Sequence, residues 1–209
     1  MVKNGQVQVY TGDGKGKTTS SLGLALRAIG QGFNVYIIQF MKGGAYTGEY
    51  IAIKNYLPNL EIAQFGRPCI KQQKQLKLSG FSGVKSPDMK IFDFIREDIE
   101  CADCRYCFLN DDIQRDYVEE GFKKALEVVM SGNYHLVILD EINTALSLSF
   151  LNLELVLDMI ANKPKQVELV LTGRNAPDEI VHIASLVTEM KAHKHYFDKG
   201  IKARRGIEY

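Results

Sequence analysis

The chain has 209 residues, which is enough for one sizeable hydrophobic core, and a single domain is the default expectation. Its 26 basic and 25 acidic residues leave a net charge of +1, so composition gives no reason to expect nucleic acid or an anionic membrane as a partner. No apolar run approaches the roughly eighteen residues that span a bilayer, and the first residues are typical of a strand, not of a signal peptide. We therefore expect a cytoplasmic protein whose four cysteines are reduced thiols or metal ligands.

A short strand is expected at Val7 to Tyr10, and a glycine-rich segment follows it directly. That segment reads Thr11-Gly12-Asp13-Gly14-Lys15-Gly16-Lys17-Thr18-Thr19. Its glycines allow consecutive N–H groups to point at an anion, and the helix expected over 20–29 directs its positive end to the same place. Lys17 adds a charge for the outer phosphates, and the Thr18 hydroxyl stands where such loops hold Mg²⁺. The strict pattern has glycine at the position of Thr11, but the neighbouring strand and helix favour a phosphate-binding loop over a surface turn.

Two further strands are expected, at Asn34 to Phe40 and at Leu60 to Phe65. The first is an almost continuous apolar run, which is typical of a strand buried on both faces of a sheet. A helix is expected between them, from Glu49 to Tyr56, and Pro58 ends it. Strand and helix therefore alternate from the start of the chain.

Residues from about 67 to 114 differ in character, because they are polar and follow no long periodicity. We interpret this stretch as an insertion that carries a helix or two beside the active face. Cys101, Cys104 and Cys107, with Cys69 upstream, offer four thiolates, enough for a Zn²⁺ or iron–sulfur site. Three consecutive ligands at this spacing are unusual for structural zinc, and thiols packed inside the insertion are the alternative.

Regular structure resumes with a helix over 116–130, whose apolar positions fall on one face. The run Leu136 to Leu139 then leads directly into Asp140 and Glu141, which is a Walker B pattern. A buried strand of a parallel sheet ends at the edge where ligands bind in open α/β sheets. These two carboxylates should therefore lie beside the phosphate loop, although surface acids after a strand would look the same.

The last third of the chain continues the alternation. We expect a helix over 153–161, a strand over 167–172, a helix over 178–184 and a last strand over 186–190. Such alternation indicates parallel strands joined by right-handed crossovers. The prediction is one α/β domain over 1–209 of the P-loop NTPase kind, with a mainly parallel sheet of five or six strands and helices on both faces.

With these motifs in place, the chain resembles the ATP:corrinoid adenosyltransferases of the BtuR/CobO type. A glycine loop and a Walker B strand alone would fit many NTPases, whereas the stretches at 168–177 and 186–209 are specific to this family. The resemblance rests on TGDGKGKTTSSLGLALRA (11–28), VYIIQFMKGGAYTGE (35–49), LVILDEIN (136–143), ELVLTGRNAP (168–177) and LVTEMKAHKHYFDKGIKARRGIEY (186–209).

The chain also departs from the family, whose members commonly place aromatic residues, including Trp, against the lower face of the corrin ring. This chain has no Trp, so the corrin-facing surface cannot be carried over. Phe81 is our first choice for that face, on a segment that closes over the ring when it binds. The candidates, for each of which ordinary packing is the favoured alternative, are Phe81, Phe92, Phe94, Tyr106 and Phe108.

The resemblance implies attack of a Co(I) corrinoid on the 5′ carbon of ATP, with release of triphosphate. Co(I) carries its own lone pair, so no general base is needed, but the charge of the leaving group must be neutralised. The implied catalytic residues are Lys17, Thr18 and Glu141, with Mg²⁺ held by Thr18 and Glu141. Asp140 either binds Mg²⁺ through water or holds Thr18.

Further residues are placed by the same resemblance. Lys42, in a glycine-flanked turn, should touch phosphate or ribose unless it is a solvated loop lysine. Arg174 should face the same site, and Glu49 should bind the ribose hydroxyls. His195 is expected to have a structural or substrate-contact role. An external electron donor such as a flavoprotein reductase is implied, because no flavin or nicotinamide fingerprint is present, and a homodimer is implied by resemblance alone.

Overall fold

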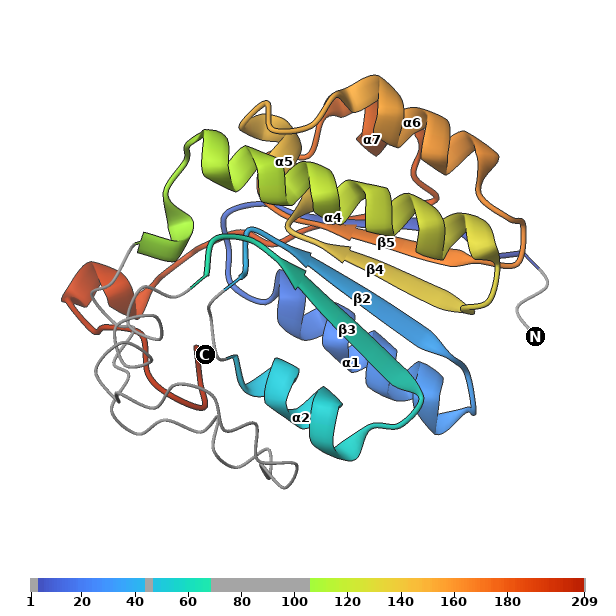
Figure 1. Ribbon diagram of the computed structural model, residues 1–209. Helices are drawn as coiled ribbons and strands as arrows, with labels where there is room; N and C mark the ends of the chain where they lie inside the picture. Colours follow the sequence, from blue (N-terminus) through green and yellow to red (C-terminus); the bar gives the residue numbers. More distant parts are fainter. Residues whose placement is uncertain (1–3, 44–46, 69–105, 209) are drawn as a thin grey trace, which may run out of the picture.

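The computed structural model describes residues 4–43, 47–68 and 106–208. Within them, six strands form one sheet in the order β3-β2-β4-β5-β1-β6, and every neighbouring pair is parallel (Figure 1). The strands are β1 Val7–Thr11, β2 Val35–Phe40, β3 Leu60–Phe65, β4 Leu136–Asp140, β5 Glu168–Thr172 and β6 Leu186–Glu189. The predicted α/β fold with a parallel sheet is confirmed, and it is consistent with the P-loop NTPase kind.

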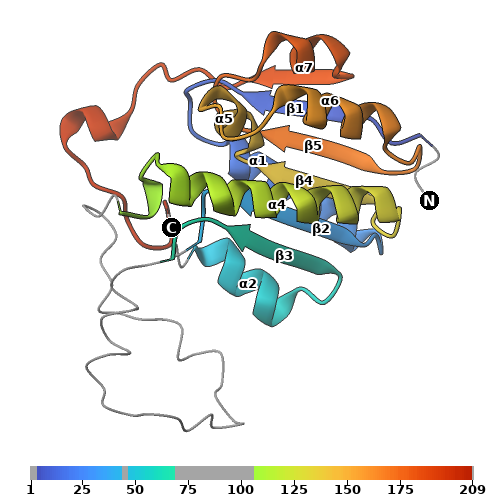
Figure 2. The same ribbon diagram turned by 45° about the horizontal axis from the view of Figure 1, so that its top comes forward.

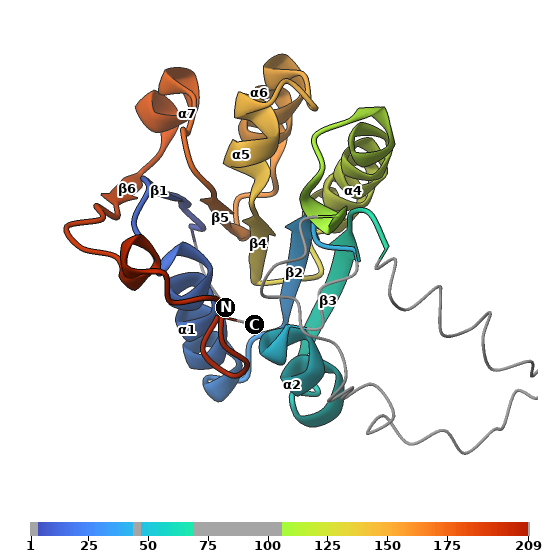
Figure 3. The same ribbon diagram turned by 90° about the vertical axis from the view of Figure 1, so that its left-hand side faces the viewer.

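Helices cover both faces of this sheet. Helices α1 and α2 lie on one face, and α4 to α7 lie on the other (Figures 1 and 3). The arrowheads of the strands point to one end of the molecule, where the C-terminal residues also lie (Figure 2). The helices are α1 Lys17–Gly30, α2 Gly48–Tyr56, α4 Asp112–Ser131, α5 Ile142–Ser147, α6 Leu153–Asn162 and α7 Asp178–Ile183, with short 3₁₀ turns η2 Tyr106–Phe108 and η3 Tyr196–Lys199.

Both faces of the central strands are buried, and this explains their nearly continuous apolar sequences. All residues of β2 and β4 are buried, because alternate side chains along each strand enter different cores. On β4, Ile138 packs toward the core under α1 and α2, whereas Leu139 packs toward the core under α4 to α7. The sheet is therefore covered on both sides, and the buried polar side chains of β2 and β4, Gln39 and Asp140, lie toward the carboxyl ends of their strands.

Two helices, α4 and α5, depart most from those that the sequence predicts. Helix α4 begins at Asp112 because Asp111 caps it, its carboxylate accepting a hydrogen bond from the Gln114 N–H at 3.0 Å. Residues 112–114, predicted to belong to the insertion, are thus its first turn, whereas 69–105 lie outside the described residues. Helix α5 was not predicted, because it is short and starts directly after the Walker B carboxylates. In the described part of the chain, no helix is long and apolar enough to cross a membrane.

A pair of glycine substitutions should affect stability in opposite directions. A Cβ on Gly43 would lie 1.6 Å from the carbonyl oxygen of Gly66, where the segments after β2 and β3 meet, so Gly43→Ala should destabilise the protein by about 1–3 kcal/mol. Gly23 is exposed within α1 and has nothing within 4 Å, so Gly23→Ala should stabilise it by about 0.5–1 kcal/mol. Urea unfolding measures both changes, and a stable Gly43→Ala variant would contradict the close approach of the two segments.

Candidate active site

The predicted phosphate loop joins the end of β1 to the first turn of α1. Gly12 and Gly16 have φ values of 91° and 119°, which lie in the region that favours glycine. The buried Lys17 folds back over the loop, and its ammonium donates to the carbonyl oxygens of Gly12 at 2.6 Å and Gly14 at 2.7 Å. Burial lowers the pKa of Lys17, the nearby Glu141 opposes that shift, and Arg174 adds to it. A cation is thus held directly above the loop.

Asp140, at the end of β4, is the polar centre of the site and is fully buried. Its Oδ1 accepts hydrogen bonds from the hydroxyls of Thr18 at 2.9 Å and Thr172 at 2.7 Å. Its Oδ2 accepts from Lys42 Nζ at 2.7 Å and from Gln39 Nε2 at 3.0 Å. The predicted proximity of the phosphate loop and the Walker B strand is therefore confirmed, because Thr18 is the first-turn residue of the loop helix. Asp140 thus contacts Thr18, one of the two roles considered for it, and a role in binding Mg²⁺ stays a prediction.

The carboxylate of Asp140 and the ammonium of Lys42 form a buried ion pair. Burial opposes the charged form of Asp140, but Lys42 and the hydroxyls of Thr172 and Thr18 outweigh it and hold the pKa of Asp140 below its ordinary value. Burial likewise opposes the charge of Lys42, yet the attraction of Asp140 raises the pKa of Lys42 above its ordinary value. Lys42 is therefore no solvated loop lysine, and its contact with phosphate or ribose stays a prediction.

Glu141, the second Walker B carboxylate, is held at the start of α5. Its backbone has φ 68°, and its Oε2 accepts a hydrogen bond from the Thr144 hydroxyl at 2.6 Å. Its own N–H donates to Thr172 Oγ1 at 3.0 Å. Thr144 Oγ1 also accepts from the N–H of Arg174 at 2.9 Å, which brings the turn after β5 beside Glu141. Positive φ at a non-glycine residue costs on the order of 1–3 kcal/mol and is concentrated at functional sites.

Comparison with known families gives the chemistry that this arrangement serves. The family model of ATP:corrinoid adenosyltransferase BtuR/CobO/CobP matches residues 3–82 and 78–209. The chain belongs to this family. The resemblance carried by the sequence motifs is thereby confirmed, and the match includes the phosphate loop, the Walker B strand and the C-terminal residues.

Individual proteins that resemble this family member align with nearly all of its residues. The corrinoid adenosyltransferase of Pseudomonas aeruginosa is 31% identical over 209 residues, which is 99% of this chain and 85% of the relative. That of Escherichia coli strain K12 is 30% identical over 207 residues, 99% of this chain and 87% of the relative. An uncharacterized Nostoc protein is 32% identical over 213 residues, covering 97% of this chain, but the chain spans only 48% of that protein.

Some polar residues of this site, Gln39 and Gln64, were not predicted from the sequence. Gln39 lies in the otherwise apolar strand β2, and it pairs in register with Gln64 on β3 and with Asp140 on β4. Its amide donates to Glu49 Oε1 at 3.2 Å, and its oxygen accepts from Gln64 Nε2 at 2.8 Å. The signal available in the sequence was a single glutamine within an otherwise apolar predicted strand. Through Gln39, Glu49 joins the Asp140 centre, while its contact with ribose stays a prediction.

Three residues at this site carry oxygen donors of the kind that Mg²⁺ prefers. They are the hydroxyl of Thr18 and the carboxylates of Asp140 and Glu141. Both oxygens of Asp140 already accept two hydrogen bonds each, so Glu141 has more free capacity for a cation. Among the described residues, no group of three or more His, Cys, Asp or Glu side chains is placed to hold a metal ion.

Other predicted loop residues have different surroundings. Asp13 and Thr19 are exposed at the loop, and Arg174 is exposed after β5. The N–H of Gly14 donates to the carbonyl oxygen of Met190 at 2.6 Å, so this amide is not directed at an anion as expected. Lys15 contacts the C-terminal residues. The nucleotide-binding roles of all these residues stay predictions.

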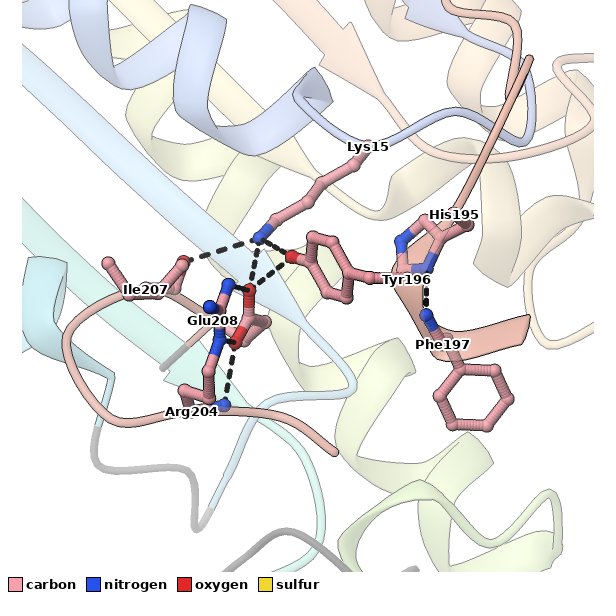
Figure 4. A network of polar contacts seen from close by, with 7 residues as sticks. All are labelled: Lys15, His195, Tyr196, Phe197, Arg204, Ile207 and Glu208. Atoms are coloured by element: carbon pink, nitrogen blue, oxygen red, sulfur yellow. Dashed lines mark hydrogen bonds and ion pairs between the residues drawn. The ribbon is translucent and has the colours of Figure 1, made fainter. Parts of the chain in front are cut away.

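His195 has a structural contact that agrees with one of its two expected roles. It precedes η3, and its Nδ1 accepts a hydrogen bond from the Phe197 N–H at 3.1 Å, which caps this short turn (Figure 4). His195 is half-buried, and the contact leaves a substrate-facing role open. Nothing in this geometry requires an acid or base.

Most residues of the predicted insertion, 69–105, lie outside the described residues. Cys69, Cys101 and Cys104 lie outside the described residues, so the four-thiolate metal site stays a prediction, and the aromatic candidates Phe81, Phe92 and Phe94 lie there as well. Cys107 is buried, and its carbonyl oxygen accepts a hydrogen bond from Gln114 Nε2 at 3.2 Å. The ring of Tyr106 lies under the guanidinium of Arg67, 4.9 Å from ring centre to Cζ.

Proposed function

We propose that this protein transfers the 5′-deoxyadenosyl group of ATP to the Co(I) centre of a corrinoid and releases triphosphate. The observation that carries the proposal is the 2.9 Å hydrogen bond between Thr18 and Asp140, which joins the phosphate loop to the Walker B strand in a member of this family. The site then combines a lysine above a glycine loop with hard oxygen donors. This combination suits a reaction whose main requirement is neutralisation of a triphosphate leaving group.

The roles of the chain's residues follow from their positions. Lys17 exchanges its loop carbonyl partners for phosphate oxygens, and the loop holds the triphosphate in line with the attacking cobalt. Thr18 and Glu141 would hold Mg²⁺, which supplies charge neutralisation at the leaving group. Asp140 orients Thr18 and fixes Lys42, and Arg174 approaches the phosphates from the turn after β5.

Two other function classes share these features. A generic ATPase or kinase uses the same loop but must position water or an acceptor hydroxyl, and it releases phosphate or ADP. A non-catalytic carrier binds a nucleotide and a corrinoid without turning either over. The three classes differ in their products, so one assay separates them.

We expect turnover only when a reduced corrinoid is present. The protein is incubated with ATP, Mg²⁺, cobalamin and a strong chemical reductant, and the visible spectrum and the phosphate products are followed. The expected result is an adenosylated cobalamin spectrum with one triphosphate released for each corrinoid consumed. Phosphate or ADP release without corrinoid would indicate an ATPase, and binding without products would indicate a carrier.

The proposal includes several further points. We infer that residues 1–209 work as one domain with an insertion at about 67–114, that the protein is a cytoplasmic homodimer, and that an external donor such as a flavoprotein reductase supplies the electron for Co(II). The homodimer rests on resemblance alone. A Zn²⁺ or iron–sulfur site at the four cysteines is a separate hypothesis that metal analysis of the purified protein would test.

A further inference from the structure

The residues after β6, which we call the C-terminal tail (190–208), return to the phosphate loop. The first contact is made by backbone atoms. The N–H of Met190 donates to the carbonyl oxygen of Thr11 at 2.9 Å, and the carbonyl oxygen of Met190 accepts from the N–H of Gly14 at 2.6 Å. A Cβ on Gly14 would lie 2.6 Å from that same oxygen. Glycine at position 14 therefore serves the close approach of the tail.

The second contact is made by the side chain of Lys15 (Figure 4). Its ammonium donates to the Tyr196 hydroxyl at 2.7 Å, to Glu208 Oε1 at 2.7 Å and to the carbonyl oxygen of Ile207 at 3.4 Å. An ammonium has three N–H donors, and the tail supplies an acceptor for each. Lys15 is thus fully engaged by residues that are 181 to 193 positions away in the chain.

Glu208 is the centre of this contact. Besides Lys15, its carboxylate accepts from the Arg204 N–H at 2.6 Å, from Arg204 Nε and Nη2 at 3.2 Å each, and from the Tyr196 hydroxyl. The side chain of Glu208 is 14% exposed, whereas those of Lys15 and Arg204 are 42% and 51% exposed. Arg204, Lys15 and Tyr196, in that order, lower the pKa of Glu208 below its ordinary value, so the carboxylate stays charged.

We propose that Glu208 is a positioning residue of the nucleotide site, which latches the C-terminal tail to Lys15 and thereby holds the phosphate loop in its binding conformation. Lys15 is then a tail anchor and not a phosphate ligand. Only Gly16, whose backbone is in the glycine-favoured region, separates Lys15 from Lys17, so a fixed Lys15 limits where Lys17 can stand. The inference rests on the proposed function.

The physical reason is preorganisation of a flexible loop. Glycine-rich segments lose more conformational freedom on ordering than other segments, and this cost opposes ligand binding if the loop is ordered only when the nucleotide arrives. Contacts at Gly14 and Lys15 order the loop beforehand. Loss of the latch should therefore weaken ATP binding while leaving the chemical step nearly unchanged.

The test compares Glu208→Gln with Glu127→Gln, which removes the same charge from an exposed pair with Lys124 on α4. ATP affinity is measured by calorimetry, and KM and kcat are measured with reduced cobalamin. We expect Glu208→Gln to raise the Kd and KM for ATP about tenfold, with kcat within about twofold of the wild type, because a charged hydrogen-bonding partner is lost. Glu127→Gln should match the wild type.

Three further variants test the proposal independently of Glu208→Gln alone. Lys15→Met should weaken ATP binding as Glu208→Gln does, and the double variant should be no weaker than either single variant, because both act through one contact. Tyr196→Phe, which removes only a hydroxyl, should give a smaller loss and guards against a folding defect in Glu208→Gln.

Two results for ATP affinity would overturn the proposal. Unchanged ATP affinity in Glu208→Gln would mean that the latch does not shape the site. Tighter ATP binding in Glu208→Gln, with weaker binding in Lys15→Met, would mean that Glu208 competes with phosphate for Lys15. A wild-type protein that binds ATP but makes no adenosylated corrinoid would refute the proposed function alone, because the latch is judged by ATP affinity.

Discussion

Lys17→Ala is expected to lower turnover by roughly a hundredfold or more while the fold survives. The ammonium of Lys17 is the charge held above the phosphate loop, by the carbonyl oxygens of Gly12 and Gly14. It opposes the negative charge that develops on the leaving triphosphate, and a fixed donor of this kind is typically worth roughly 3 kcal/mol of barrier. Steady-state kinetics with reduced cobalamin measure the loss.

Matched variants separate this loss from a general effect of charge or folding. Lys123→Ala removes the same charge from an exposed position on α4 and should retain wild-type turnover. Thr18→Ala should also lose roughly a hundredfold, because the hydroxyl that bonds Asp140 is gone, whereas Thr18→Ser keeps a hydroxyl and should recover most of the activity. Near-normal turnover in Lys17→Ala would mean that the loop binds something other than the leaving group.

Asp140→Asn is expected to destabilise the protein by about 3–5 kcal/mol, the largest stability effect that we predict. The side chains of Asp140 and Lys42 are only 1% and 15% exposed, so removal of the carboxylate charge leaves the Lys42 ammonium buried without a counter-ion. Urea unfolding followed by circular dichroism measures the change. A loss below about 1 kcal/mol, the range of exposed pairs, would contradict a buried ion pair.

A double variant distinguishes the pair from two independent residues. Asp140→Asn combined with Lys42→Met removes both charges, so the double variant should be more stable than Asp140→Asn alone.

The contribution of this ion pair to stability should be lost at both low and high pH. The lowered pKa of Asp140 means that its contribution to stability is lost as pH falls through the folded value, below about 4, and the raised pKa of Lys42 means that its contribution is lost as pH rises above about 10.

The sequence by itself determined the elements whose signal is local. The apolar run into Asp140 and Glu141 predicted a buried strand ending in carboxylates, and the glycine segment after Tyr10 predicted a phosphate loop, because both patterns lie within a few residues. Alternation of strand and helix then predicted a parallel sheet with helices on both faces. The prediction for the central strands holds because burial on both faces requires a nearly continuous apolar sequence.

Only the tertiary structure decided which polar side chains meet at the carboxyl edge. The order of the strands places β5 between β1 and β4, so Thr172 reaches Asp140, and Gln39 reaches it from β2. Lys42 was predicted to touch phosphate or ribose, and its partner Asp140, 98 positions away, was not foreseen. Lys15 likewise contacts Glu208 at a separation of 193 positions. Local periodicity reports which face of an element is buried, whereas contacts over such separations depend on how the elements pack.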